Sequence, residues 1–301
     1  MALDFEEILK EKVLSAEQTV RGYLPEEEGF QKTVLKAMNY SVEAGGKRLR
    51  PIFMREAFLL YGGKGALVEP FMAAMEMIHT YSLVHDDLPA MDNDIYRRGR
   101  YTTWKVYGEA MGVLAGDGLL NYAYETALRA FDMAAPAEYE AVVRAMKILT
   151  QKAGVYGMIG GQTVDVEAEG NNSVLSMDEL LFIHEKKTAA LIQAGLMVGA
   201  ALAGADEQGL DAMERLGMNV GLAFQIQDDI LDVIGDSKVL GKEVGSDAKN
   251  EKVTYVTLRG LEESKRQVEL LSEEAVEILK QIPGDSLFLE ELIYSLIHRE
   301  K

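Results

Sequence analysis

Acidic side chains gather in one short stretch of this chain, and their spacing could support metal chemistry. Asp86 and Asp87 end an apolar helical pattern that begins near Phe71, and Asp92 and Asp94 follow shortly after. Carboxylates crowded at a helix C-terminus, which is itself partly negative, repel one another unless a cation lies among them. Mg²⁺ is typically held by one or two carboxylates and completes its shell with water and phosphate oxygens. The stretch therefore predicts a magnesium site, with an acidic surface loop as the alternative.

A second acidic stretch has the spacing of one helix face. Gln225, Asp228 and Asp232 stand at i, i+3 and i+7 among largely apolar neighbours, so they share one stripe of a helix. Acids on such a stripe need a partner, because burying an unpaired charge is costly. Cations follow downstream at Lys242 and Lys252. The pattern predicts a second metal-binding helix, and a solvated surface face is the alternative.

Basic side chains cluster at two places in a chain whose net charge is −18. One cluster lies in residues 45–51, where two glycines precede Lys-Arg-Leu-Arg-Pro, and the other contains Arg97, Arg98 and Arg100. Glycines that lead into a helix start, with cations nearby, offer N–H groups and positive charge to an anion. His79 precedes Asp86 by two helical turns and so projects on the same face. These features predict anion sites beside the first acidic stretch, against solvated linker charges and a core histidine as alternatives.

Two further polar positions border apolar segments. Gln162 and Asp165 are one helical turn apart and would share a face. Lys187 and Thr188 open an apolar stretch that runs to Gly204. The first pair is a candidate for a functional role, and the second would lie at the edge of the core. A helix junction and a lysine that extends to solvent are the alternatives.

Composition narrows the class of protein. With 48% hydrophobic and 27% charged residues, the chain is typical of a soluble globular protein. Its negative charge argues against a general binder of nucleic acid or of anionic membranes. The chain has no cysteine and no secretory pattern at its N-terminus, which suits a reducing compartment, and we expect a cytoplasmic protein. The apolar stretch 188–204 is short for a membrane span, so we expect none.

The hydrophobic pattern is helical almost throughout. Apolar residues recur at three- and four-residue intervals in 3–20, 31–44 and 49–61, and such patterns resume from residues 69, 105, 138, 177, 207, 262 and 285. Ser176, Asp206 and Asp285 have the character of N-caps. Strand alternation is nowhere sustained, and no linker divides the chain. We therefore expect one all-α domain over residues 1–301, a helical bundle with a central active-site cavity between the helices.

These motifs together resemble those of the trans-isoprenyl diphosphate synthases, the polyprenyl synthetases, over nearly the whole chain. The resemblance rests on the aspartate motifs 86–92 and 228–232 and on the basic segment 45–51. Four residues separate the second and last aspartates of the first motif, and Tyr81 stands five residues ahead of it. That arrangement is similar to the short-chain bacterial subgroup and closest to its farnesyl diphosphate synthases.

The resemblance implies roles for individual residues of an isoprenoid synthase fold, which is usually homodimeric and binds three Mg²⁺ per site, with Mn²⁺ as a substitute. The implied metal-binding residues are Asp86, Asp87, Asp92, Asp228, Asp229 and Asp232. The implied ligands of an allylic diphosphate are Arg97, Lys187, Lys242 and Lys252, and those of isopentenyl diphosphate are Lys47, Arg50, His79 and Arg98. The residues implied beside the reacting carbons are Thr188 and Gln225, and Tyr81 would limit product length.

The implied reaction is the Mg²⁺-dependent condensation of isopentenyl diphosphate with dimethylallyl or geranyl diphosphate, through ionisation, condensation and proton elimination. Farnesyl diphosphate is the expected product, and geranylgeranyl diphosphate is the alternative. A terpene cyclase has no use for a second diphosphate site, so the basic residues argue against it. A non-catalytic subunit of a synthase heterodimer would be expected to lose aspartates, whereas both motifs are intact here.

Overall fold

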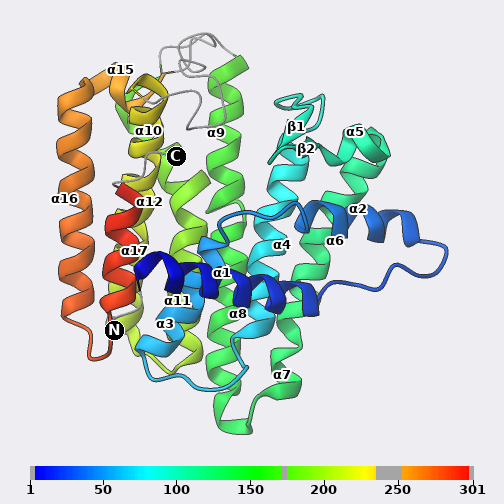
Figure 1. Cartoon of the computed structure of the whole chain (residues 1–301), viewed down its shortest axis with the longest axis horizontal. Helices are drawn as coiled ribbons and strands as arrows, with labels where there is room; N and C mark the ends of the chain where they lie inside the picture. The colour runs from blue at the N-terminus through cyan, green and yellow to red at the C-terminus, as the bar shows by residue number, and fades with distance from the viewer. Residues whose placement is uncertain (1–3, 171–174, 235–252, 298–301) are drawn as a thin grey trace.

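The computed structural model describes residues 4–170, 175–234 and 253–297, and these residues form a helical bundle (Figure 1). Lys242 and Lys252 lie outside the described residues. The helices are α1 (Phe5–Gly22), α2 (Lys32–Val42), α3 (Leu49–Leu60), α4 (Glu69–Asp86), α5 (Thr103–Tyr107), α6 (Glu109–Leu128), α7 (Ala130–Met133), the 3₁₀ turn η1 (Pro136–Glu138), α8 (Tyr139–Ala153), α9 (Met158–Gly170), α10 (Met177–Ile183), the π-helix η2 (His184–Ala189), α11 (Ala190–Leu202), α12 (Glu207–Ile234), α15 (Tyr255–Arg259), α16 (Leu261–Lys280) and α17 (Leu287–Ile297). Within these ranges the strands are β1 (Tyr96–Arg97) and β2 (Arg100–Tyr101), an antiparallel pair.

Local sequence signals account for several helix starts. The Ser176 hydroxyl accepts the N–H of Glu179 at 3.3 Å, and the Glu179 carboxylate accepts the N–H of Ser176 at 2.9 Å, which is a reciprocal capping box. Asp206 accepts the N–H of Gly209 at 2.8 Å at the start of α12. Pro51 lies in the first turn of α3, where its missing N–H has no cost. These predicted starts are confirmed.

Helix α11 is buried along its whole length, and it packs against α3, α8 and α12. Small residues permit this close approach, since a Cβ at Gly199 would lie 2.1 Å from the Met54 carbonyl oxygen of α3. One apolar cluster draws side chains from helices between α1 and α17, and the expectation of one domain over residues 1–301 stays a prediction. The apolar stretch is therefore the centre of the bundle, and none of the described helices is long and apolar enough to cross a bilayer.

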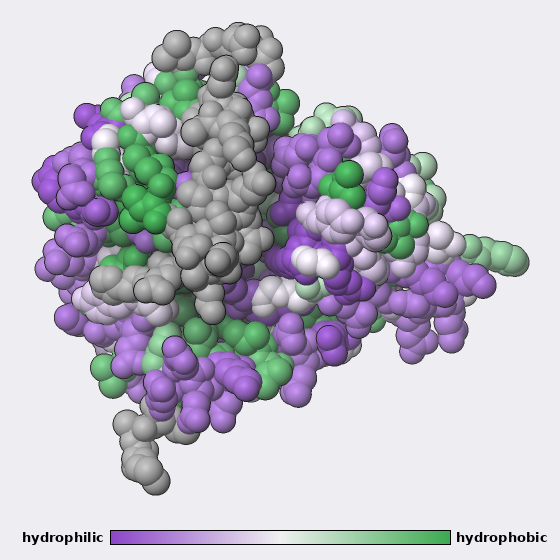
Figure 2. Space-filling view, turned by 45° about the horizontal axis from the view of Figure 1, so that its top comes forward, coloured by the Kyte–Doolittle hydropathy of each residue, from purple (hydrophilic) through white to green (hydrophobic). Residues whose placement is uncertain are grey.

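Two local features differ from the sequence-based expectation. The helical pattern expected to begin at Lys105 is divided by Gly108 (φ 88°) into α5 and α6. The helix expected to begin near Thr188 is preceded by the π-helix η2. Glycine adopts a positive φ at little cost and ends the first helix, whereas the π-helix packs against α9 and α12. Figure 2 shows one largely hydrophilic face of the molecule with separate hydrophobic patches.

Candidate active site

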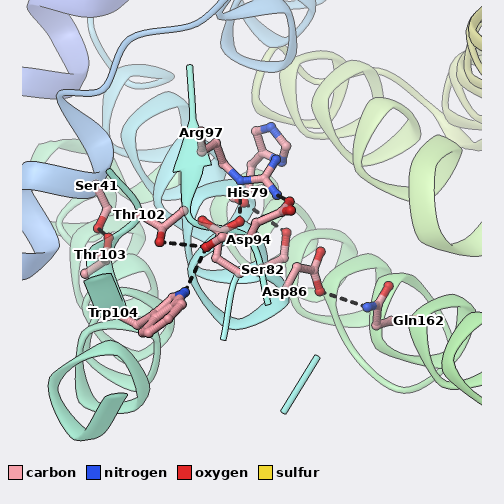
Figure 3. A network of polar contacts seen from close by, with 11 residues as sticks. Ser41, His79, Ser82, Asp86, Asp94, Arg97, Thr102, Thr103, Trp104 and Gln162 are labelled. Atoms are coloured by element: carbon pink, nitrogen blue, oxygen red, sulfur yellow. Dashed lines mark hydrogen bonds and ion pairs between the residues drawn. The ribbon is translucent and has the colours of Figure 1, made fainter. Parts of the chain in front are cut away.

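The first aspartate motif begins at the last residue of α4, and the second lies near the C-terminus of α12; both helices end at the same, upper end of the bundle in Figure 1. Asp86 ends α4, and its Oδ1 accepts a hydrogen bond from Gln162 Nε2 of α9 at 2.8 Å. Figure 3 shows the two side chains turned toward each other. Burial, followed by the nearby Asp92 and Asp165 and opposed by Lys187 and Arg97, raises the pKa of Asp86 to about 6. A carboxylate that burial disfavours is a group that a cation would stabilise.

The Asp87 carboxylate has a different partner from that of Asp86. Its side chain is buried, and its Oδ1 accepts from Arg97 Nε at 2.6 Å. The same guanidinium donates through Nη2 to Asp94 at 3.2 Å, so two carboxylates hold Arg97. Burial raises the pKa of Asp87 to about 6 although Arg97 acts to lower it. In this arrangement Asp87 orients an arginine at the edge of the site.

Arg97 and Arg98 belong to the β1–β2 hairpin, which sequence alternation did not predict. Arg98 (φ 52°) and Gly99 (φ 74°) form its two-residue turn, and two positive φ values are typical of a type I′ turn. The Arg98 guanidinium donates to the Gly45 carbonyl. A Cβ at Gly46 would lie 2.8 Å from its central carbon. The glycine pair therefore lets the hairpin arginine pack directly on the basic segment 45–51.

His79, two turns before Asp86 on α4, lies among arginines of segment 45–51 and of the β1–β2 hairpin. Arg50 Nη1 lies 3.4 Å from His79 Nε2, and Figure 3 shows Arg97 close to the imidazole. Burial, followed by the charges of four arginines, lowers the pKa of His79 well below its ordinary value. Burial likewise lowers the pKa of Arg50 to about 10. A neutral imidazole among guanidiniums is a hydrogen-bonding anion site, because it avoids adding another charge.

Arg48 has a different environment from its neighbours in the basic segment. It is 5% exposed, its Nη1 lies 2.5 Å from Glu76 Oε1, and its Nη2 donates to the Val42 carbonyl at 2.7 Å. These contacts hold the start of α3 against α2 and α4. Arg50 lies beside His79 instead, and Lys47 is exposed.

The opposite wall is formed by η2, α9 and α12. The Lys187 ammonium lies 2.5 Å from Asp165 Oδ2, and Asp165 is buried. The Thr188 hydroxyl donates to Gln225 Oε1 at 3.0 Å. A Cβ at Gly161 would lie 2.2 Å from the Lys187 backbone nitrogen, so α9 and η2 are in direct backbone contact. The structure thus brings the predicted pair Thr188 and Gln225 together.

The acids of α12 do not share one environment. Asp228 is half-buried and Asp232 is buried. Asp229, which lies off their stripe, accepts the N–H of Tyr255 at 2.8 Å, and its Oδ2 is 3.9 Å from His184 Nε2. It therefore fastens α12 to the start of α15 and to η2. A supporting role for Asp229 and a ligand role for Asp228 stay predictions.

The donor set fits Mg²⁺ without a preformed protein cage. Asp86 and Asp92 are joined through the Asp92 N–H and the Asp86 carbonyl at 2.9 Å, and the charge of Asp92 contributes to the raised pKa of Asp86. No group of three or more His, Cys, Asp or Glu side chains in the described ranges could hold an ion by itself. Mg²⁺ needs no such group, since it is usually bound by one or two carboxylates with water and phosphate oxygens.

Sequence reasoning noticed Gln162 and Asp165 without assigning them a place in the site, and it missed the π-helix altogether. The signal for the pair was their one-turn spacing in an apolar segment. Only the folded chain shows that Gln162 holds Asp86 and that Asp165 holds Lys187. No sequence signal marks η2, although π turns often occur at functional sites.

Asp86→Asn is expected to stabilise the metal-free protein at pH 7.5 by about 1 kcal/mol, because it removes a half-buried charge and keeps an oxygen for Gln162. The folded pKa lies above the ordinary 3.8. The carboxyl's contribution is therefore fully present below about pH 4 and is lost as the pH rises through about 6. Chemical denaturation in EDTA should show the gain at pH 7.5 and no gain near pH 4. The exposed Asp211→Asn on α12 is the control, and an equal gain there would contradict the explanation.

Comparison with known proteins decides the family. The polyprenyl synthetase model matches residues 31–283, most of the chain. The chain belongs to the polyprenyl synthetase family. Farnesyl diphosphate synthase of Geobacillus stearothermophilus is 42% identical over 287 residues, which cover 95% of each chain. Geranylgeranyl diphosphate synthase of Cyanophora paradoxa is 43% identical over 269 residues, 89% of this chain and 88% of that one.

Solved structures agree with the assignment of this polyprenyl synthetase. A geranyltransferase from Helicobacter pylori, complexed with magnesium and isoprenyl diphosphate, is 31% identical with a TM-score of 0.81. The match covers 99% of this chain and 97% of that one. The predicted all-α fold and the predicted trans-isoprenyl diphosphate synthase family are therefore confirmed. Relatives named for two different product lengths match almost equally well.

Proposed function

We propose that this polyprenyl synthetase condenses isopentenyl diphosphate with dimethylallyl or geranyl diphosphate and releases farnesyl diphosphate. The observation that carries the proposal is the meeting of acids and cations at one end of α4. Asp86 is held by α9, while His79 lies among the arginines of segment 45–51 and the hairpin. Such a site accommodates metal ions and two diphosphates together. The identity to the Geobacillus farnesyl diphosphate synthase supports the product.

The allylic diphosphate would bind Arg97 and Lys187, with Lys242 and Lys252 as further ligands from outside the described residues. Asp87 and Asp165 orient the first two cations. Asp86, Asp92 and Asp228 would hold three Mg²⁺, supported by Asp87, Asp229 and Asp232. When bound, the metal neutralises the charge that builds on the leaving diphosphate as the allylic C–O bond breaks.

The Thr188 and Gln225 oxygens would lie beside the allylic cation. Their hydrogen bond at 3.0 Å fixes both side chains, so that oxygen dipoles are in place before positive charge develops. Lys47, Arg50, His79 and Arg98 would hold isopentenyl diphosphate so that its alkene attacks the cation. The released diphosphate then takes the proton that restores a double bond, so no side-chain base is required. Apolar helix faces exclude the water that would quench the cation.

A terpene cyclase is the second candidate that these acids allow, and the basic residues argue against it. Arg50 at the start of α3, His79 on α4 and Arg98 in the hairpin turn lie close together, which supplies an anion site that a cyclase does not need. A non-catalytic subunit has no need of metal ligands, whereas both motifs are present.

A homodimer is part of the proposal. Exposed apolar side chains lie on α6, namely Val113, Leu114 and Leu128, and Val143 is similarly exposed on α8. An apolar face of this kind suits a second copy of the chain. Light scattering during size-exclusion chromatography should give twice the chain mass of 33.2 kDa, and a mass of one chain would contradict this part.

One incubation tests the function. Purified protein, Mg²⁺ and isopentenyl diphosphate, with dimethylallyl or geranyl diphosphate, should yield farnesyl diphosphate by chromatography of the dephosphorylated products. A cyclic hydrocarbon formed without isopentenyl diphosphate would identify a cyclase. No turnover at saturating Mg²⁺ would favour a non-catalytic subunit, and twenty-carbon product would assign the protein to the geranylgeranyl group.

Lys47→Ala and Arg98→Ala are each expected to raise the KM for isopentenyl diphosphate about ten- to a hundredfold, with smaller changes in kcat. Each variant removes a charge-assisted hydrogen bond to the substrate that does not ionise. Steady-state kinetics with each substrate varied in turn provides the measurement. Arg266→Ala, in an exposed pair with Glu263 on α16, is the control. A rise confined to the KM of the allylic substrate would show that the two diphosphate sites are reversed.

A further inference from the structure

The loop between α4 and the β1–β2 hairpin carries Asp92, and its two ends are fixed in different ways. At its start, the Asp92 N–H donates to the Asp86 carbonyl at 2.9 Å, so this end is tied to α4. At its other end, the Asp94 carbonyl accepts two side-chain hydrogen bonds, from Thr102 Oγ1 at 2.8 Å and from Trp104 Nε1 at 2.9 Å. Figure 3 shows both donors converging on Asp94. This carbonyl therefore fixes the far end of the loop.

Both donors are anchored to other parts of the bundle. Thr102 is 2% exposed, and its N–H donates to the Ile95 carbonyl at 3.0 Å, which continues the hairpin ladder. Trp104 belongs to α5 and packs on α6, where a Cβ at Gly112 would lie 3.0 Å from Trp104 Cβ. Leu88 of the loop packs against the same glycine, with its Cδ2 2.9 Å from that Cβ position. The indole N–H is thus held in place against both α6 and the loop.

The residue that these donors hold also orients Arg97. The Asp94 side chain is 50% exposed, and its Oδ2 accepts from Arg97 Nη2 at 3.2 Å, while the buried Asp87 accepts from Arg97 Nε. An exposed ion pair on a loop is weak, because both side chains lose conformational freedom when they pair. A main chain that is already fixed at Asp94 reduces this loss, so the pair with Arg97 gains from the two hydrogen bonds on the Asp94 carbonyl.

We propose that Trp104 is a positioning residue, whose indole N–H, together with the Thr102 hydroxyl, fixes Asp94 and through it orients the Arg97 guanidinium. The inference rests on the proposed function, because Arg97 is the arginine that receives the allylic diphosphate there. Arg97 is thereby preorganised, and substrate binding does not have to order it. Trp104 itself touches neither substrate nor metal.

Trp104→Phe tests the proposal, since phenylalanine keeps an aromatic ring and lacks the N–H. The KM for the allylic diphosphate should rise about three- to tenfold, with kcat changed less than about twofold and the isopentenyl KM little affected. Trp104→His carries a ring N–H at the equivalent position and should return the KM to within about twofold of wild type. Calorimetry with inorganic diphosphate and Mg²⁺ should give the same order of affinity.

The matched control is Tyr40→Phe on α2. The Tyr40 hydroxyl donates to the Tyr101 carbonyl of the same hairpin at 2.7 Å, and phenylalanine keeps the ring that lies under Arg100. This variant also loses a side-chain bond to a hairpin carbonyl, but not one to Asp94, so its allylic KM should match wild type. A wild-type allylic KM in Trp104→Phe, or equal losses in Trp104→His or Tyr40→Phe, would overturn the proposal.

The indole N–H can also be observed directly, because Trp104 is the only tryptophan in the sequence. Labelling tryptophan with the heavy nitrogen isotope gives a single indole resonance, and exchange of its proton with solvent should be at least about tenfold slower than in free tryptophan. Thr102→Val should shift this resonance, since Thr102 bonds to the same oxygen. Exchange at the free rate would overturn the proposal even if Trp104→Phe failed to fold. Failure of the proposed function would appear separately, as wild-type protein that forms no prenyl diphosphate while indole exchange and diphosphate affinity are still measurable.

Discussion

Asp86→Ala and Asp228→Ala are each expected to fold normally and to lose condensation activity by about a thousandfold or more in kcat. A bound metal contributes several kcal/mol of charge stabilisation in the transition state, and each 1.4 kcal/mol is a factor of ten. Both side chains are only half-buried, so their removal leaves no large cavity. Turnover at saturating Mg²⁺ and the far-ultraviolet circular dichroism spectrum together provide the measurement.

Asp211→Ala is the matched control, because it changes an exposed aspartate more than four turns before Asp228 on the same helix. It should retain wild-type turnover. A Mg²⁺-induced rise in Tm in the presence of inorganic diphosphate should be present in wild type and the control and weakened in Asp86→Ala and Asp228→Ala. Wild-type turnover in either of these variants would refute the corresponding metal ligand.

Tyr81→Ala is expected to move the product from fifteen carbons to twenty or more. Its Cα lies about 7.5 Å along the helix axis from that of Asp86, toward the buried part of the bundle. The ring is 6% exposed. If a growing prenyl tail extends from its metal-bound head down this direction, the ring ends the space available to it. Alanine would open apolar volume that a longer tail can fill.

The surroundings of Tyr81 make this a demanding test. Its ring packs edge-on against His85 one turn away, with centroids 5.8 Å apart. A Cβ at Gly116 of α6 would lie 2.0 Å from His85 Nε2, so His85 lies directly on α6. Burial, followed by the neighbouring Tyr124, raises the pKa of Tyr81. The ring thus belongs to the α4–α6 contact. Packing between these two helices is therefore the alternative to a role in limiting product length.

Tyr81→Phe separates these two roles. It keeps the ring and should keep the fifteen-carbon product, while Tyr81→Ala lengthens it at unchanged KM for both diphosphates. Product chain length by liquid chromatography and mass spectrometry provides the measurement. A fifteen-carbon product from an active Tyr81→Ala enzyme would mean that the tyrosine is core packing only.

Much of the fold can be predicted from the amino-acid sequence. Helices α4 and α12 and the capped starts at Ser176 and Asp206 follow from 3.6-residue periodicity and from side chains that bond to nearby N–H groups, which are local effects. The β1–β2 hairpin was missed because two-residue strands carry no alternation. The π-helix was missed because no pattern of neighbouring residues marks its wider i→i+5 turn.

The candidate site was likewise predicted only in part. The residue types and spacing of Asp86, Asp92, Asp228 and the basic segment 45–51 indicated metal and diphosphate chemistry, since a bound counter-charge offsets the repulsion between neighbouring like charges. The sequence did not predict which of the basic residues face the site. Arg48 is closed into a pair with Glu76, whereas Arg50 lies beside His79.

The sequence by itself determined the all-α class, the helices that carry the aspartates and the family, because periodicity and motif spacing are properties of neighbouring residues. Only the tertiary structure decided that Gln162 holds Asp86, that Asp165 holds Lys187 and that Asp87 holds Arg97. These partners are 76, 22 and 10 residues apart. Their contacts depend on how α4, α9, η2 and the hairpin pack, and no local pattern encodes that packing.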